Sequence, residues 1–230
     1  MLETIQLSGE RSTNARKISR LDDMLCLQAA MNDVAKPDWK TNPPNWSLAI
    51  IAEAGELLDH LGYKWWKSQT PDLAQAQMEV VDLWHFELSA VLCTPGLDTY
   101  LLHRIHGATV MQEPYVGEFS PEPDRDLVFS LTQDYVASAA RSASSSLLRV
   151  TSLLDLAYAL GLTFDDLYKL YTAKNVLNMF RQDHGYKTGT YIKVWDGKED
   201  NQHLQEILNE RPDATVTELL AALKLRYPVV

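Results

Sequence analysis

Trp46-Ser-Leu-Ala-Ile-Ile-Ala-Glu53-Ala-Gly-Glu56-Leu-Leu-Asp59 and Met78-Glu79-Val-Val-Asp82-Leu-Trp-His85-Phe are the two stretches that decide the fold. In each of them two carboxylates stand three residues apart, so on a helix they are neighbours on one face. The other positions are apolar almost all the way round, which is typical of a buried helix. Buried ionised carboxylates need a partner or a metal ion. Four of them on neighbouring helices therefore indicate a cationic site, for which we expect Mg²⁺.

Composition bounds the class of protein. The 230 residues are 46% hydrophobic, enough for one large domain or two small ones. A net charge of -10 argues against a general binder of nucleic-acid polymers or membrane surfaces. Cys26 and Cys93 fit neither a disulfide framework nor a zinc cluster. No apolar run reaches the roughly 18–20 residues of a membrane span, and Met1–Arg20 lacks a secretory apolar segment. We expect a cytoplasmic protein.

The rest of the chain also predicts helices. Residues 1–16 are polar and are expected to be loosely structured. Helical patterns or boundary signals cover residues 18–34, 97–111, 126–141, 147–160, 163–182, 202–209 and 216–226. No period-two strand and no solenoid-type repeat is evident, so the prediction is an all-α bundle. We expect one catalytic domain over residues 1–230, with a mobile sub-domain within about 93–162 as an open alternative.

The four carboxylates have two interpretations. Mg²⁺ takes oxygen ligands and keeps waters and substrate phosphates in its remaining positions. Glu53, Glu56, Glu79 and Asp82 would suit two or more such ions bridged by a polyphosphate. Either pair alone is better explained as a solvent-facing stripe, whereas both pairs together favour the metal site. His85 is a poor Mg²⁺ ligand beside carboxylates and is expected to make a structural hydrogen bond.

A second group of polar residues is basic. Lys174, Asn178 and Arg181 fall on one helical face, and the following loop contains three glycines and offers Tyr186, Lys187, Tyr191 and Lys193. Arginine and lysine beside free amides are what an anionic phosphate chain needs. The alternative is a solvated basic helix end, which the helix dipole favours and which would prevail for this run alone. Next to a metal site of the polyphosphate type, the run is interpreted as the phosphate-binding partner.

A third, weaker signal lies in the first predicted helix. Gln28 and Asn32 stand one turn apart, and side-chain amides can read the edge of a base, although most such residues are simply on the surface. The aromatic and basic turn Tyr63–Lys67 could stack on a base or cap the core.

With these motifs assembled, the chain resembles the dimeric, all-α dUTP diphosphatases of the MazG-like NTP pyrophosphohydrolase superfamily. The resemblance covers Leu27–Asn32, Glu53–Asp59, Lys64–Lys67, Glu79–Phe86, Lys174–Lys187 and Trp195–Asn201. The acidic motif is shared across the superfamily, while the run from Lys174 to Lys187 is specific to the dUTPase branch. One departure is Tyr63, where the family turn usually begins with tryptophan.

The resemblance implies a homodimeric enzyme that hydrolyses dUTP and dUDP to dUMP with Mg²⁺. It makes Glu53, Glu56, Glu79 and Asp82 the metal ligands, with Glu56 or else Glu53 as the catalytic base. The implied phosphate contacts are Lys174, Arg181, Tyr186, Lys187 and Lys193. The implied nucleoside contacts are Gln28, Asn32, Trp65 and Asn178, with Trp46 as a further candidate.

Two other functions stay open at this point. One is a broader pyrophosphohydrolase of the same superfamily, acting on dCTP as well as dUTP or on damaged nucleotides. The other is a non-catalytic nucleotide-binding protein that kept the fold.

Overall fold

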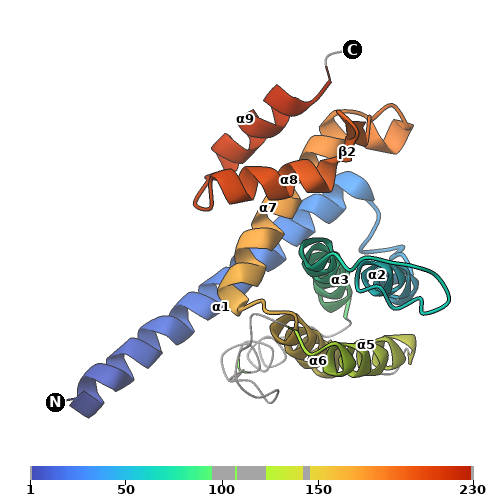
Figure 1. Ribbon diagram of the computed structural model, residues 1–230. Helices are drawn as coiled ribbons and strands as arrows, with labels where there is room; N and C mark the ends of the chain where they lie inside the picture. Colours follow the sequence, from blue (N-terminus) through green and yellow to red (C-terminus); the bar gives the residue numbers. More distant parts are fainter. Residues whose placement is uncertain (1, 95–106, 108–122, 142–145, 229–230) are drawn as a thin grey trace.

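Helices account for nearly all regular structure in the residues that this computed structural model describes, which are 2–94, 107, 123–141 and 146–228 (Figure 1). In chain order, the helices are α1 (Leu2–Ala35), α2 (Trp46–His60), α3 (Leu73–Leu92), α5 (Arg125–Ala140), α6 (Ser146–Ala159) and α7 (Phe164–Asp183). A 3₁₀ turn, η1 (Tyr186–Thr188), leads to a hairpin of β1 (Val194–Trp195) and β2 (Lys198–Glu199), then to α8 (Asp200–Glu210) and α9 (Val216–Arg226). The all-α prediction is confirmed.

The helices form two groups that share α3. In one group α2 packs along α3, and the pair α5 and α6 packs beneath them (Figure 1). In the other group α7 lies between α1 and α9 and also contacts α3, while α8 packs against α9 (Figure 1). Because α3 belongs to both groups, its side chains are buried on nearly every face, from Gln75 to Val91.

Polar side chains cap the starts of three helices. The side chain of Asn45 accepts a hydrogen bond from the backbone N–H of Leu48 at 3.1 Å, which caps α2. Asp72 caps α3 in the same way, and Thr163 forms a capping box with Asp166 at the start of α7. Gly62 follows α2 with φ 68°, a conformation that glycine adopts without strain.

Three details differ from the sequence-based prediction. The first helix begins at Leu2 rather than near residue 18. α2 is buried only along Ile50, Ala54 and Leu57, so it is amphipathic rather than enclosed. The loop over residues 184–198 contains a short hairpin, turned by Asp196 and Gly197, which both have positive φ.

Much of the proposed mobile sub-domain and nearly all of the predicted helix over residues 97–111 lie outside the described residues. Among the described helices, none is long and apolar enough to cross a membrane.

Candidate active site

Three glutamates converge where α2 packs on α3. Glu53 and Glu56 come from α2 and Glu79 from α3, and each contributes a carboxylate oxygen lying within 4.8 Å of those of the other two. Glu79 is only 3% exposed, Glu53 is partly buried and Glu56 is exposed. The group therefore runs from the core of the protein to the solvent, and this arrangement follows from the three-residue spacing on two packed helices.

Electrostatic strain in this group is visible in two pKa values. Burial raises the pKa of Glu79 to about 8, and the neighbouring charge of Asp82 adds to the shift. Burial also raises the pKa of Glu53 to about 7, with further contributions from Asp82 and Glu56. Lys174 opposes both shifts without cancelling them. A bound cation would relieve this repulsion, and the donors are the hard oxygens that Mg²⁺ prefers.

Asp82, the fourth predicted ligand, lies next to this group and is paired with Lys174. The Lys174 ammonium is 1% exposed and donates to Asp82 Oδ2 at 2.7 Å and to Asn201 Oδ1 at 2.9 Å. The lysine predicted to bind phosphate thus holds a carboxylate of the acidic site in the free protein.

Arg181 has a similar internal partner. Its Nε and Nη2 atoms each donate to one oxygen of Asp200 at 2.8 Å, and its Nη1 donates to Asn178 Oδ1 at 3.0 Å. The hydroxyl of Tyr191 also donates to Asp200, at 2.8 Å. The guanidinium lies 5.6 Å from the ring centroid of Tyr186, which is exposed. α8, through Asp200 and Asn201, therefore orients Lys174 and Arg181.

A cavity of about 320 Å³ opens beside the acidic group, between α1, α2, α3 and α7. Predicted residues of all three kinds line it: Glu53 and Asp82, Arg181 and Tyr186, and Gln28, Asn32 and Asn178. Sequence reasoning gave little or no role to several other lining residues, chiefly Trp39, Trp46, His85 and Phe86.

Six predicted site residues do not line this cavity. Glu56 and Glu79 belong to the acidic group and Lys174 is paired with Asp82, whereas the other three have no such link to the acidic group. Trp65 stands on the turn after α2 and is 84% exposed. Lys187 is exposed beyond α7, and Lys193 is paired with Glu199 at 2.9 Å. Their predicted roles stay predictions.

The predicted base readers form a closed hydrogen-bond network. Gln28 Nε2 donates to Asn32 Oδ1 at 3.0 Å and to Ser89 Oγ at 2.9 Å. Gln28 Oε1 accepts from the Tyr171 hydroxyl at 2.9 Å and lies 2.7 Å from His85 Nδ1. Asn32 Nδ2 donates to Ser89 Oγ at 3.1 Å. Tyr171 and Ser89 were absent from the predicted site, because each stands among apolar residues of a buried helix.

The two ring nitrogens of His85 have different surroundings. Burial lowers its pKa to about 4, so the ring is neutral at pH 7. Nδ1 faces Gln28, as the structural prediction required, whereas Nε2 is buried with no hydrogen-bond partner among the described residues.

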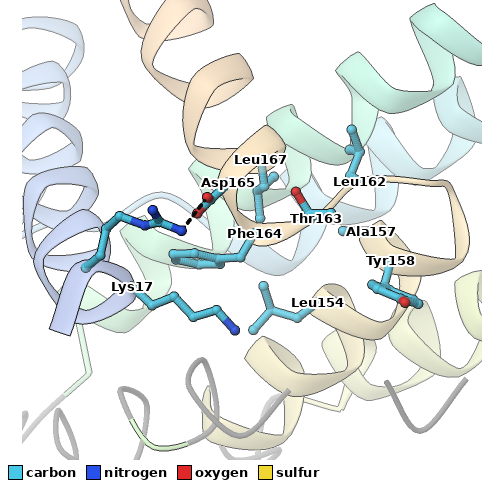
Figure 2. Close-up of a pocket in the computed structure, with 10 residues that line it drawn as sticks. Lys17, Leu154, Ala157, Tyr158, Leu162, Thr163, Phe164, Asp165 and Leu167 are labelled. Atoms are coloured by element: carbon cyan, nitrogen blue, oxygen red, sulfur yellow. Dashed lines mark hydrogen bonds and ion pairs between the residues drawn. The ribbon is translucent and has the colours of Figure 1, made fainter. Parts of the chain in front are cut away.

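A second cavity, of about 370 Å³, lies between α1, α6 and the start of α7 (Figure 2). Its walls are mainly apolar, including Leu154, Leu162 and Phe164, with Lys17 and the Arg16–Asp165 ion pair at its edge. None of the predicted site residues lines it. The predicted site residues that line a cavity therefore gather at the one beside the carboxylates.

Comparison with known proteins gives one finding on the family. A protein-family model described as dUTPase matches residues 20–186 of the chain. The matched stretch includes both acidic helices, the four carboxylates and the basic face of α7. A search of curated proteins found no match.

Proposed function

The chain belongs to the dUTPase family and is a dUTP diphosphatase, and we propose that it converts dUTP and dUDP to dUMP in an Mg²⁺-dependent reaction. The observation that carries the Mg²⁺ requirement is the convergence of three glutamate carboxylates beside a cavity lined by Asp82, Arg181 and Gln28. This is one volume in which divalent ions, a phosphate chain and a base could be held together.

The residues present fit Mg²⁺. The possible ligands are all carboxylate oxygens, from Glu53, Glu56 and Glu79. The raised pKa values of Glu53 and Glu79 mean that a nearby positive charge would stabilise their ionised forms. Asp82 would complete the ligand set once Lys174 shares it or releases it. When bound, Mg²⁺ would neutralise phosphate charge and make an attacking water more acidic.

The protein residues have distinct parts in this reaction. Glu56 is the exposed member of the acidic group, so it can reach bulk water and is our candidate for the base, with Glu53 as the alternative. Arg181 is fixed by Asp200 and Asn201 and offers its remaining Nη1–H, with the N–H groups of Asn178, to the phosphate or deoxyribose. Lys174 holds Asp82 in place, and its positive charge, which lies behind that carboxylate, would attract the phosphate chain.

We also propose a cytoplasmic homodimer within the MazG-like superfamily. The outer face of α2 exposes Leu48 and Ile51, and the following turn exposes Trp65 and Trp66. Exposed apolar side chains grouped in this way, two on the helix and two on the turn, are typical of an association surface. Free Cys26 and Cys93 are compatible with a reducing compartment.

Turnover of dUTP, dUDP, dCTP and dTTP at equal concentrations, with Mg²⁺ or with EDTA, tests the proposal. We expect dUMP from dUTP and dUDP, loss of that product in EDTA, and loss in Glu53→Gln with Mg²⁺ present. Equal rates on dCTP would favour the broader pyrophosphohydrolase. Undiminished dUTP turnover in EDTA would contradict the metal requirement, and tight dUTP binding in Mg²⁺ without turnover would indicate a non-catalytic protein.

A further inference from the structure

The Gln28 amide has no hydrogen-bonding capacity left for a ligand. Both of its N–H groups are taken, by Asn32 Oδ1 and Ser89 Oγ. Its oxygen faces His85 Nδ1 and accepts from the Tyr171 hydroxyl, whose proton is shared with the Met24 carbonyl at 3.0 Å, so both acceptor positions are occupied. Gln28 therefore lines the cavity, but its amide is fully engaged by other residues of the protein.

The hydrogen-bond network places the proton of His85 on Nδ1. The Ser89 hydroxyl donates to the His85 backbone carbonyl at 2.9 Å, so its oxygen accepts from the amide nitrogens of Gln28 and Asn32, and the Gln28 amide oxygen points to the imidazole. An oxygen without a proton requires Nδ1–H on His85. In a neutral ring, Nε2 is then an unprotonated acceptor. Nε2 lies on the side of the ring away from Gln28 and has no partner among the described residues.

We propose that Tyr171 and Ser89 are positioning residues for base selectivity: they hold Gln28 so that His85 keeps Nδ1–H and presents Nε2 as an acceptor to the base. This inference rests on the proposed function, because it assigns the 320 Å³ cavity to the base. The ring of Tyr171 also stacks on His85, with centroids 4.2 Å apart, so one side chain sets both the orientation and the tautomer of the histidine.

The resulting pattern matches uracil and opposes cytosine. Uracil has a donor at N3–H and an acceptor at O4, whereas cytosine has an acceptor at N3 and a donor at its exocyclic amine. His85 Nε2 would accept from uracil N3–H, and Asn32 has a second N–H, beyond the one given to Ser89, that suits O4. With cytosine, two acceptors would meet at N3 and two donors at the exocyclic group. Buried mismatches of this kind discriminate strongly between ligands.

The first test compares Tyr171→Phe with Tyr168→Phe. Both variants lose a tyrosine hydroxyl on α7 that donates to α1, but Tyr171 contacts Gln28 and His85, whereas Tyr168 donates to Asp23 on the surface. We expect Tyr171→Phe to lower the ratio of kcat/KM for dUTP to that for dCTP by about 5- to 10-fold, the effect of one buried hydrogen bond. The change should fall mainly on KM. Ser89→Ala should change the ratio in the same direction, and Tyr168→Phe should not change it.

Equal losses on dUTP and dCTP in Tyr171→Phe would overturn the inference, because they would mean a purely structural role. If no nucleotide is turned over, the proposed function fails, and affinities for the non-hydrolysable α,β-imido analogues of dUTP and dCTP give the same ratio.

The second test reads the tautomer directly in the wild-type chain. A long-range ¹H–¹⁵N correlation spectrum at pH 7, with the His85 signals identified by their absence in His85→Gln, shows which nitrogen is protonated. We expect Nδ1–H and a bare Nε2. A proton on Nε2, alone or in an imidazolium, would overturn the inference whether or not the protein is active.

Discussion

At the scale of single residues, Glu79 is a carboxylate whose burial has a large expected effect on stability. Its ionised form would be stabilised by a bound metal ion and destabilises the fold without one. Its pKa rises from an ordinary 4.5 to about 8, so the folded protein holds this proton more tightly than the unfolded chain does. The free energy of unfolding should therefore fall as the pH rises from about 5 to 8 in EDTA. Glu79→Gln removes this ionisation. We expect the variant to exceed wild type in stability by about 3 kcal/mol at pH 8, and to match it near pH 5.

Urea denaturation followed by circular dichroism at both pH values measures this difference. Glu210→Gln, which changes an exposed glutamate on α8, serves as the control and should follow wild type. Glu79→Gln should also be inactive and lose most of the stabilisation that Mg²⁺ gives wild type. An unchanged pH dependence in Glu79→Gln would mean that Glu79 does not carry the strain.

Single residues also show how far sequence reasoning reaches into the site. The carboxylates could be found because their spacing on a helix is a local property of the chain. The internal partners of Lys174 and Arg181 could not be found, because Asn201 and Asp200 lie some 20 to 30 residues away and contact them only through the return of α8. For His85 the sequence predicted a structural hydrogen bond but not its partner, because Gln28 comes from another helix.

Between elements, a buried ion pair joins α6 to α3. Arg149 Nε lies 3.1 Å from both carboxylate oxygens of Glu87, which has no exposed surface, and Tyr135 of α5 donates to the same carboxylate at 3.2 Å. Arg149→Met leaves this carboxylate buried without its cation. We expect a loss of about 3 kcal/mol in the free energy of unfolding, measured with urea.

Two further variants interpret that loss. Lys198→Met removes a half-exposed lysine from its surface pair with Glu206 and should cost less than about 1 kcal/mol. Glu87→Gln combined with Arg149→Met should recover much of the stability, because no buried charge is then unpaired. A loss as small in Arg149→Met as in Lys198→Met would show that the pair does not hold α6 to α3.

Elements were easier to predict than their surroundings. Caps such as Asn45, Asp72 and Thr163 mark helix starts through bonds to their own neighbours, so local sequence sufficed. The first turns of α1 carry polar residues and no capping signal, which concealed the helix. The exposure of Leu48 and Ile51 depends on which helices pack against α2, and the apolar composition of α2 does not reveal which of its faces are covered.

At the scale of the whole molecule, the exposed face of α2 bears on oligomeric state. Leu48 is 62% exposed beside Ile51, and the proposed homodimer would cover this face. Leu48→Glu would bury a charge in such an interface, so we expect the dimer to weaken on the order of 100-fold. Sedimentation velocity over a concentration series measures this. Leu225→Glu is the matched control, because Leu225 is 88% exposed on α9. Dimerisation unaffected by Leu48→Glu would place the interface elsewhere.

Lys174 and Arg181 have their hydrogen-bond partners on α8, and this matters when the chain is shortened. The family match ends at residue 186, so a fragment cut there would look complete by its motifs. It would nevertheless lack Asn201 and Asp200, which contact Lys174 and Arg181. Lys174 and Arg181 would lose these hydrogen-bond partners, although the fragment would keep all four carboxylates of the predicted metal site. We therefore propose that the last forty or so residues belong to the catalytic domain.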